Sequence, residues 1–396
     1  MKKNSAKTLW YILFAVIAVA LCYLFVVVYF FYISPYSISS KTTVWPFLSD
    51  MAVGELCLDA TVEIDFTVVE EDNFNEKVEH KIVGVNIRKD GFVVAPYSDL
   101  RNADPDSPIR IYANSGEIFE GVVLYGDMNY NLAILKCESL NENGLVALPY
   151  VEIAGVSNKV YFDSRVIMVG SPVDSGEIVI NDVTDHNLVC GIETEIDGNF
   201  AVDYVLEYCF TTRVGVNDTL ETAAVFNDDG QLMGFVDDVY QGEKVVMAAE
   251  GAENFLSDVV SSYQNGQTYQ NNLVSAFVGF DYLDVLCFMD ESSLNSDETL
   301  FYFNEQWQSY TTDIYYFANN SDSGFYLFED FDYNGNFIAA GNVVTALSFN
   351  SHSHSIDSRV DMFDLVYELK SGDSVTIYFQ SVEDLGDLNQ KITFTV

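Results

Sequence analysis

Positive charge is scarce in this sequence: 18 lysine and arginine residues stand against 60 aspartate and glutamate residues, and the formal net charge is −42. The imbalance is stronger after residue 49, because every acidic residue lies from Asp50 onward, while Lys2, Lys3, Lys7 and Lys41 precede it. Such a surface repels phosphate groups. We therefore expect neither nucleic acid nor anionic lipid to be a partner of this acidic part.

Cysteine and histidine, the usual ligands of zinc and other transition metals, are also few. The chain has six cysteines and four histidines, with no Cys-x-x-Cys pair and no Cys/His cluster at zinc-ligand spacing. The run 330–335 resembles the opening of a calcium loop, but Gly341 stands where an EF-hand requires glutamate, so a reverse turn is preferred. We expect no metal and no cofactor. Cys190 and Cys209 could lie on neighbouring strands, either as a disulfide or as buried thiols.

Charge is absent altogether from residues 8–40, and this segment is apolar as far as Ile33. A helix of that length crosses a hydrocarbon core of about 30 Å. The apolar run is longer than the core of a signal peptide, so we predict an uncleaved transmembrane anchor at residues 8–33. Because lysines precede the span, the positive-inside rule predicts a cytoplasmic tail at residues 1–7 and an extracytoplasmic remainder.

The remainder divides into two predicted units. Residues 34–55, with Ser, Thr and Pro, are predicted to be a linker. From residue 56 to residue 264, short runs rich in Val, Ile, Phe and Tyr alternate with turn sequences, which predicts many short strands and hence a mainly β sandwich or a pair of barrels. The turn sequences lie at residues 89–91, 114–116, 141–144 and 228–230.

Two helices are expected beside these strands. Apolar residues recur at helical spacing within 249–263, which predicts an amphipathic helix; they are Ala252, Phe255, Leu256, Val259 and Val260. Polar residues 265–272 follow as a second linker. The unit 273–396 then mixes strands with one helix near 358–369, which predicts an α+β domain.

Four segments follow one another in an order that resembles a known family. They are GVNIRKDGFVVAPYSDL (84–100), GVVLYGDMNYNLAILKC (121–137), a segment with a Gly-Ser-Pro turn (160–191) and FTTRVGVNDTLETAAVFNDDGQLMGF (210–235). In this order they resemble the protease domain of the HtrA/DegP family of trypsin-like serine proteases. The resemblance implies a trypsin-like double β-barrel over residues 56–264.

The positions that match the catalytic triad of the family hold other residues. Ser98 stands at the histidine, Asn131 at the aspartate and Glu221 at the nucleophilic serine. Acyl transfer of this kind needs an imidazole to move the proton and a carboxylate to orient it. The loop 219–223 also lacks the glycines that let backbone N–H groups hold an oxyanion. We therefore predict a catalytically inactive member, with a degenerate site at these three positions.

The C-terminal third resembles the PDZ domain of the same family. Phe277, Val278, Gly279 and Phe280 resemble its carboxylate-binding loop, and residues 341–350 and 369–379 resemble two later strands. A PDZ domain binds a C-terminal peptide by adding it as a strand to a sheet edge. The resemblance therefore implies peptide binding at these four residues, although an insertion at about 290–323 departs from a minimal PDZ domain.

Our leading hypothesis is a membrane-anchored, extracytoplasmic pseudoprotease. It would bind protein or peptide partners outside the membrane, as a homo-oligomer or together with active relatives, and would not bind nucleic acid. Two alternatives remain open: an endopeptidase with an unconventional active site that uses Glu221 or Ser98, and a structural envelope protein.

Overall fold

The computed structural model describes most of the chain after residue 49. The described residues are 50–70, 76–127, 129–140, 146–154, 164–173, 176–196, 199–213, 222–240, 243–277, 279–280, 324–327, 329–381 and 390–396. None of their helices is long and apolar enough to cross a membrane. The tail at 1–7, the predicted anchor at 8–33 and the predicted insertion at about 290–323 lie outside these residues.

The first barrel is a closed antiparallel sheet of six strands. Its order is β1-β2-β3-β6-β5-β4, and β4 pairs with β1 to close the barrel. The strands are β1 (Thr61–Glu70), β2 (Glu76–Arg88), β3 (Phe92–Pro96), β4 (Ile109–Ala113), β5 (Ile118–Asp127) and β6 (Leu132–Ser139). Its interior is filled by a cluster of buried side chains that includes Ile64, Val93 and Leu135. A single turn of helix, α3 (Tyr97–Leu100), follows β3.

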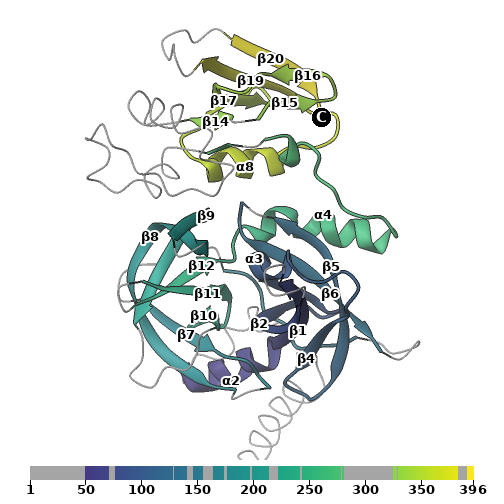
Figure 1. Ribbon diagram of the computed structural model, residues 1–396, viewed down its shortest axis with the longest axis vertical. Helices are drawn as coiled ribbons and strands as arrows, with labels where there is room; N and C mark the ends of the chain where they lie inside the picture. Colours follow the sequence, from purple (N-terminus) through teal and green to yellow (C-terminus); the bar gives the residue numbers. More distant parts are fainter. Residues whose placement is uncertain are drawn as a thin grey trace, which may run out of the picture.

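The second barrel repeats the topology of the first. Its closed order is β10-β11-β12-β9-β8-β7, which is the same arrangement with six added to each strand number. The strands are β7 (Arg165–Val169), β8 (Ile178–Ile196), β9 (Asn199–Arg213), β10 (Ala224–Asn227), β11 (Leu232–Tyr240) and β12 (Glu243–Ala248). The two closed barrels, which lie side by side in Figure 1, are consistent with a trypsin-like double barrel.

The described part of the C-terminal unit contains a sheet and one α-helix. The sheet has the order β13-β14-β17-β19-β20, with β18 paired to β17, and a separate hairpin is formed by β15 and β16. The elements are η4 (Val274–Ala276), β13 (Gly279–Phe280), β14 (Phe325–Leu327), β15 (Phe331–Tyr333), β16 (Asn336–Ile338), β17 (Asn342–Phe349), β18 (His352–Ser355), α8 (Arg359–Glu368), β19 (Ser374–Ser381) and β20 (Gln390–Thr395).

Local sequence signals explain several of these elements. Glycines in three of the predicted turns have positive φ angles that favour glycine, namely Gly91 (82°), Gly116 (83°) and Gly230 (76°). Asn334 and Gly335 also have positive φ angles and form the turn between β15 and β16, so the run 330–335 contains the preferred reverse turn together with strand β15. Helix α8 begins with a capping box, in which Ser358 Oγ accepts from the N–H of Asp361 and the Asp361 carboxylate accepts from the N–H of Ser358.

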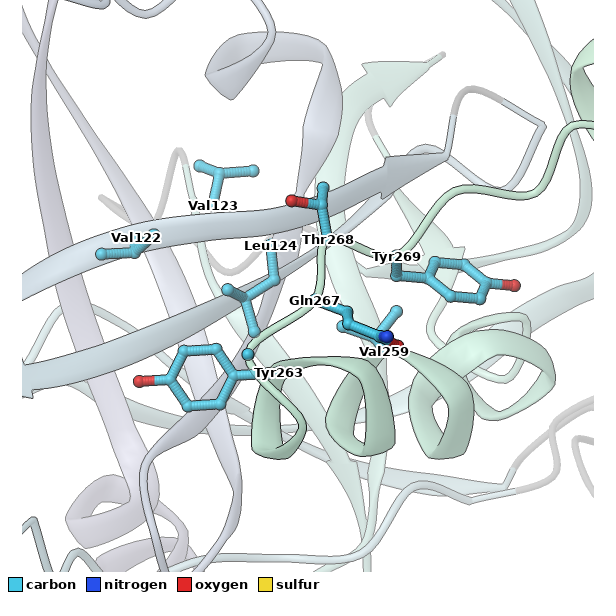
Figure 2. Close-up of a pocket in the computed structure, with 9 residues that line it drawn as sticks. Val122, Val123, Leu124, Val259, Tyr263, Gln267, Thr268 and Tyr269 are labelled. Atoms are coloured by element: carbon cyan, nitrogen blue, oxygen red, sulfur yellow. The ribbon is translucent and has the colours of Figure 1, made fainter.

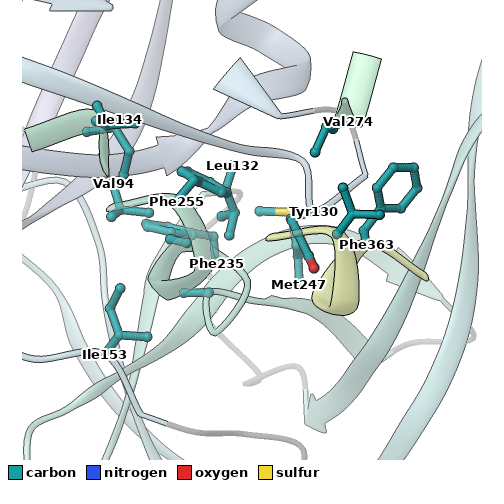
Figure 3. Packing of buried hydrophobic residues seen from close by; sticks show 14 of the residues in the cluster. Val94, Tyr130, Leu132, Ile134, Ile153, Phe235, Met247, Phe255, Val274 and Phe363 are labelled. Carbon is teal, nitrogen blue, oxygen red and sulfur yellow. The ribbon is translucent and has the colours of Figure 1, made fainter. Parts of the chain in front are cut away.

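The amphipathic helix predicted within 249–263 is α4 (Ala252–Gln264). Phe255, Val259 and Val260 are buried on its inner face. They belong to a hydrophobic cluster that runs from between the two barrels into the C-terminal unit. Figure 3 shows part of this cluster, with Phe235 from the second barrel and Phe363 from α8 on either side of α4. The helix therefore joins all three parts.

One boundary differs from the sequence analysis. Residues 50–55, assigned to the linker, and the first five residues of the predicted barrel domain form helix α2 (Asp50–Ala60). Val53, Cys57 and Ala60 recur at helical spacing and are buried, and α2 packs against strands of both barrels. Composition alone missed this short helix, because its apolar face is only three side chains long.

The predicted neighbouring positions of Cys190 and Cys209 fall on the adjacent strands β8 and β9. The register of these strands pairs Cys209 with Leu188 and Cys190 with Leu206, so the two cysteines are not directly opposite.

Candidate functional site between the barrels

The structure brings Ser98 and Asn131 together, although 33 positions separate them in the chain. Ser98 lies in α3, directly after β3, and Asn131 lies directly before β6. The N–H of Ser98 donates to Asn131 Oδ1 at 2.6 Å, and Asn131 Nδ2 donates to Ser98 Oγ at 3.2 Å. The carbonyl of Asn131 also accepts from the N–H of Tyr97 at 3.0 Å. Strands β3 and β6 are neighbours in the first barrel, and this pairing holds the two residues in register.

Asn131 is completely buried and has a φ angle of 51°. Asparagine tolerates this left-handed conformation better than most residues, because its short polar side chain can hydrogen-bond locally. The amide uses both of its polar atoms on Ser98. It therefore acts as a local structural connection between β6 and α3.

The third predicted position, Glu221, lies outside the described residues, but its neighbours Thr222 and Ala223 are described. They line a cavity of ≈ 40 Å³ together with Pro96 and Asp99 of the first barrel. The remaining lining comes from β2 and β11, so the cavity lies where the two barrels meet.

Asp99 is a cavity residue that the sequence analysis did not single out. The residue is exposed, but partial desolvation of its carboxyl group raises the pKa above the usual value, while the charges of His80 and Arg101 act in the opposite direction. His80 is stacked on Phe66, with the ring centroids 5.8 Å apart, and is exposed on β2. The only signal in the sequence is that Asp99 directly follows Ser98.

The hydroxyl of Ser98 and the amide of Asn131 cannot carry out acid–base catalysis near neutral pH. Neither group gains or loses a proton there, and general base catalysis needs a group whose pKa lies near the working pH. The pair therefore keeps a hydrogen bond at this place in the barrel but supplies neither a proton acceptor nor a negative charge.

The turn that carries Asn131 is fastened to the C-terminal unit. Asp127, buried at the end of β5, accepts from the N–H groups of Asn129 and Tyr130 at 2.8 and 3.1 Å. The same carboxylate accepts from the hydroxyl groups of Tyr125 and Tyr367, of which Tyr367 belongs to α8. The hydroxyl groups of Tyr125 and Tyr367 are 2.8 Å apart.

A second set of contacts lies beside the first. The hydroxyl of Tyr130 donates to Asp364 Oδ1 at 2.5 Å, and Asn254 Nδ2 of helix α4 donates to the same oxygen at 2.7 Å. We refer to these six residues as the junction cluster: Tyr125, Asp127, Tyr130, Asn254, Asp364 and Tyr367. Arg359, at the start of α8, adds a hydrogen bond to the carbonyl of Asn129 at 3.3 Å. The junction cluster thus joins α8 to the turn before Asn131.

The predicted peptide-binding residues fall at the first edge of the C-terminal sheet. Phe277 is buried, and its ring lies 4.5 Å from that of Phe331 between centroids, so its side chain is part of the core. Val278 lies outside the described residues. Gly279 and Phe280 form β13, which pairs with β14 and stands at the end of the strand order. Among the described strands, β13 is therefore an edge to which an extended peptide can be added.

Comparison of the chain with protein-family profiles and with curated proteins gives no match.

Proposed function

We propose that this chain is a non-hydrolytic member of the HtrA/DegP family of trypsin-like proteins, a pseudoprotease that binds proteins or peptides. The observation that carries the proposal is the hydrogen-bonded pair of Ser98 and Asn131 at the place where an active relative needs histidine and aspartate. The closed double barrel supports it, because this fold brings the corresponding strands to the same junction. Without an imidazole and its carboxylate, the mechanism of these proteases has no route for the proton.

The binding side of the proposal rests on the C-terminal unit. Its resemblance to a PDZ domain and the edge position of β13 support capture of a C-terminal peptide by strand addition. Helix α8 packs near η4, the turn that precedes β13, so the sheet edge is held on a folded support. We further propose that residues 8–33 anchor the chain in a membrane, with both folded units outside and with homo-oligomers or active relatives as possible assemblies.

The first experiment tests hydrolysis. The purified full-length chain is incubated with casein beside the triple variant Ser98→His/Asn131→Asp/Glu221→Ser, which restores the triad residue types. We expect the unaltered chain to leave casein intact. Cleavage by the unaltered chain would refute the proposal, and its loss in Glu221→Gln or Ser98→Ala would then identify the alternative, an endopeptidase with an unconventional active site.

The second experiment tests peptide binding. A library of peptides with either a free or an amidated C-terminus is presented to the full-length chain. Binding that requires the free carboxylate is expected, because a carboxylate held by backbone N–H groups loses its charge on amidation. Failure of every peptide to bind would favour a structural envelope protein instead.

A further inference from the structure

A second cavity lies on the outer surface of the first barrel, away from the junction of the barrels. Its volume is ≈ 320 Å³, and it lies between β5, helix α4 and the segment that follows α4. Figure 2 shows Val122 and Leu124 on the strand, and Val259 and Tyr263 on the helix below it. Cavities that hold a ligand group usually measure about 300–1,000 Å³. This one is large enough for an apolar side chain.

Apolar surface continues from the cavity along the strand pair β5–β6. Ile118 and Val122 are 44% and 36% exposed, and Leu140, directly after β6, is 51% exposed. Side chains two positions apart in a strand share a face, so Ile118, Glu120 and Val122 form one row. Phe119 of β5 pairs with Ser139 of β6 at the end of this strand pair. Ile118, one residue before Phe119, therefore lies beside Leu140, one residue after Ser139. We call this surface, with its cavity, the β5–α4 groove.

Carboxylates stand among these apolar side chains. Glu120 and Glu138 are directly opposite each other in the β5–β6 register, and both are exposed. Like charges in this position destabilise a sheet. Arg110 Nη1 lies 3.7 Å from Glu120, and Glu138 accepts a hydrogen bond from Tyr263 at 2.9 Å and interacts electrostatically with Lys136. A cation placed between the two glutamates would relieve their repulsion.

Charge also limits what can occupy the groove. The part of the chain after residue 49 holds every one of the 60 acidic residues, so a second copy, an anionic lipid surface or a nucleic acid placed in this groove would bring further negative charge against Glu120 and Glu138. Asp258 on α4 adds further negative charge beside the cavity. Burial raises the pKa of the cavity residue Tyr269, and the charge of Asp258 raises it further. The complementary occupant is cationic and carries apolar side chains.

We propose that the β5–α4 groove binds an extended basic segment of a partner protein. An apolar side chain of the segment enters the cavity beside Val122, and lysine or arginine side chains lie beside Glu120 and Glu138. This site is distinct from the β13 edge, and the proposal does not depend on peptide capture there.

The probe is the peptide acetyl-Lys-Leu-Lys-Leu-Lys-amide, titrated calorimetrically into the full-length chain in neutral detergent at low ionic strength. Its amidated end cannot use a carboxylate site. Two peptides serve as controls: one with glycine in place of leucine and one with glutamate in place of lysine. We expect the leucine–lysine peptide to bind at least about tenfold more tightly than the glycine peptide, because only leucine fills the cavity. The glutamate peptide should not bind, and added salt should weaken the complex.

Variants locate the site. Glu120→Gln/Glu138→Gln should weaken binding by about tenfold, which corresponds to the loss of two exposed ion pairs. Val122→Thr keeps the β-branched shape and should weaken binding by about fourfold. The matched controls, Glu79→Gln on β2 and Ile180→Thr on β8, remove an exposed charge and an exposed apolar side chain elsewhere.

Three results of the binding measurements would overturn the proposal. They are equal affinity for the glycine peptide, which would mean attraction by charge alone; equal effects of the control variants; and no binding of the leucine–lysine peptide. Association of the chain with itself that the double glutamine variant abolishes would also overturn it, since the occupant would then be a second copy.

Discussion

Removal of the Tyr130 hydroxyl is expected to loosen helix α8 from the first barrel. Tyr130 is 9% exposed, and its hydroxyl group donates to Asp364 over 2.5 Å. The variant Tyr130→Phe deletes this donor but keeps the ring, whose centroid lies 6.4 Å from that of Phe255 and 6.1 Å from that of Tyr367. The change therefore isolates the hydrogen bond from the packing.

The expected magnitude follows from the chemistry of the pair. A hydrogen bond to a charged group contributes about 1.5–3 kcal/mol, and Asn254 still donates to Asp364 in the variant. We expect the free energy of separating α8 from the barrel to fall by about 2 kcal/mol. This change corresponds to an increase of about 30-fold in the population of the separated state.

The effect should depend on pH. Burial raises the pKa of Asp364, while the hydrogen bonds from Tyr130 and Asn254 lower it. The Tyr130 hydrogen bond favours the ionised carboxylate, so its stabilisation is present above the pKa of Asp364 and is lost as the pH falls through that value. The variant and the unaltered chain should therefore become more alike in acid.

Hydrogen exchange measured by mass spectrometry tests this prediction on the full-length chain. Amides of α8 and of the turn 127–131 should exchange about 30-fold faster in Tyr130→Phe, and those of the second barrel should not change. Tyr112→Phe, on β4, is the matched control. Exchange in α8 within twofold of the unaltered chain at neutral pH would refute the view that this contact holds the units together.

Three further predictions concern stability. The pKa of Asp65 is raised to about 6, first by burial and then by the charge of Glu63, while the charge of Lys81 lowers it. The stability of the chain should therefore fall as the pH rises from about 4 to about 6. In urea unfolding, Asp65→Asn should stabilise the chain by about 1 kcal/mol at pH 8, after allowance for solvent screening, and by about zero at pH 4. Asn131→Ala should lower the free energy of unfolding by about 2–3 kcal/mol, because the N–H of Ser98 loses its acceptor and alanine disfavours the positive φ. Asn131→Gly loses the same acceptor but tolerates the positive φ, so its free energy of unfolding should lie between those of the unaltered chain and Asn131→Ala. Phe255→Ala should cost about 3–5 kcal/mol by leaving a cavity at the centre of the shared cluster, whereas Ser257→Ala on the exposed face of α4 should lower the unfolding midpoint little.

Much of the secondary structure could be predicted, because its causes are local. The spacing of Phe255, Val259 and Val260 determines one face of α4 whatever lies against it. Gly91 and Gly116 adopt backbone angles that few other residues tolerate, so their turns follow from residue type. Helix α2 was missed because its apolar face is three side chains long and follows a polar segment.

The candidate site could be predicted only in part. Ser98 and Asn131 were found through the resemblance of their surrounding strands, and their contact depends on the pairing of β3 with β6. The junction cluster had no signal, because Tyr130 and Asp364 are 234 positions apart and neither lies in a recognisable motif. The β5–α4 groove likewise needs strand and helix to be placed together.

Composition and local pattern determine the sign and extent of the charge, the strand and helix periods, and the residue types at positions 98, 131 and 221. Tertiary structure alone decided that two barrels close with the same strand order, that Asp99 lines the cavity between them and that α8 binds the turn before Asn131. The physical reason is that residue chemistry and periodicity act over a few positions of the chain. Burial and hydrogen bonding across more than 200 positions exist only after the barrels have closed and packed together.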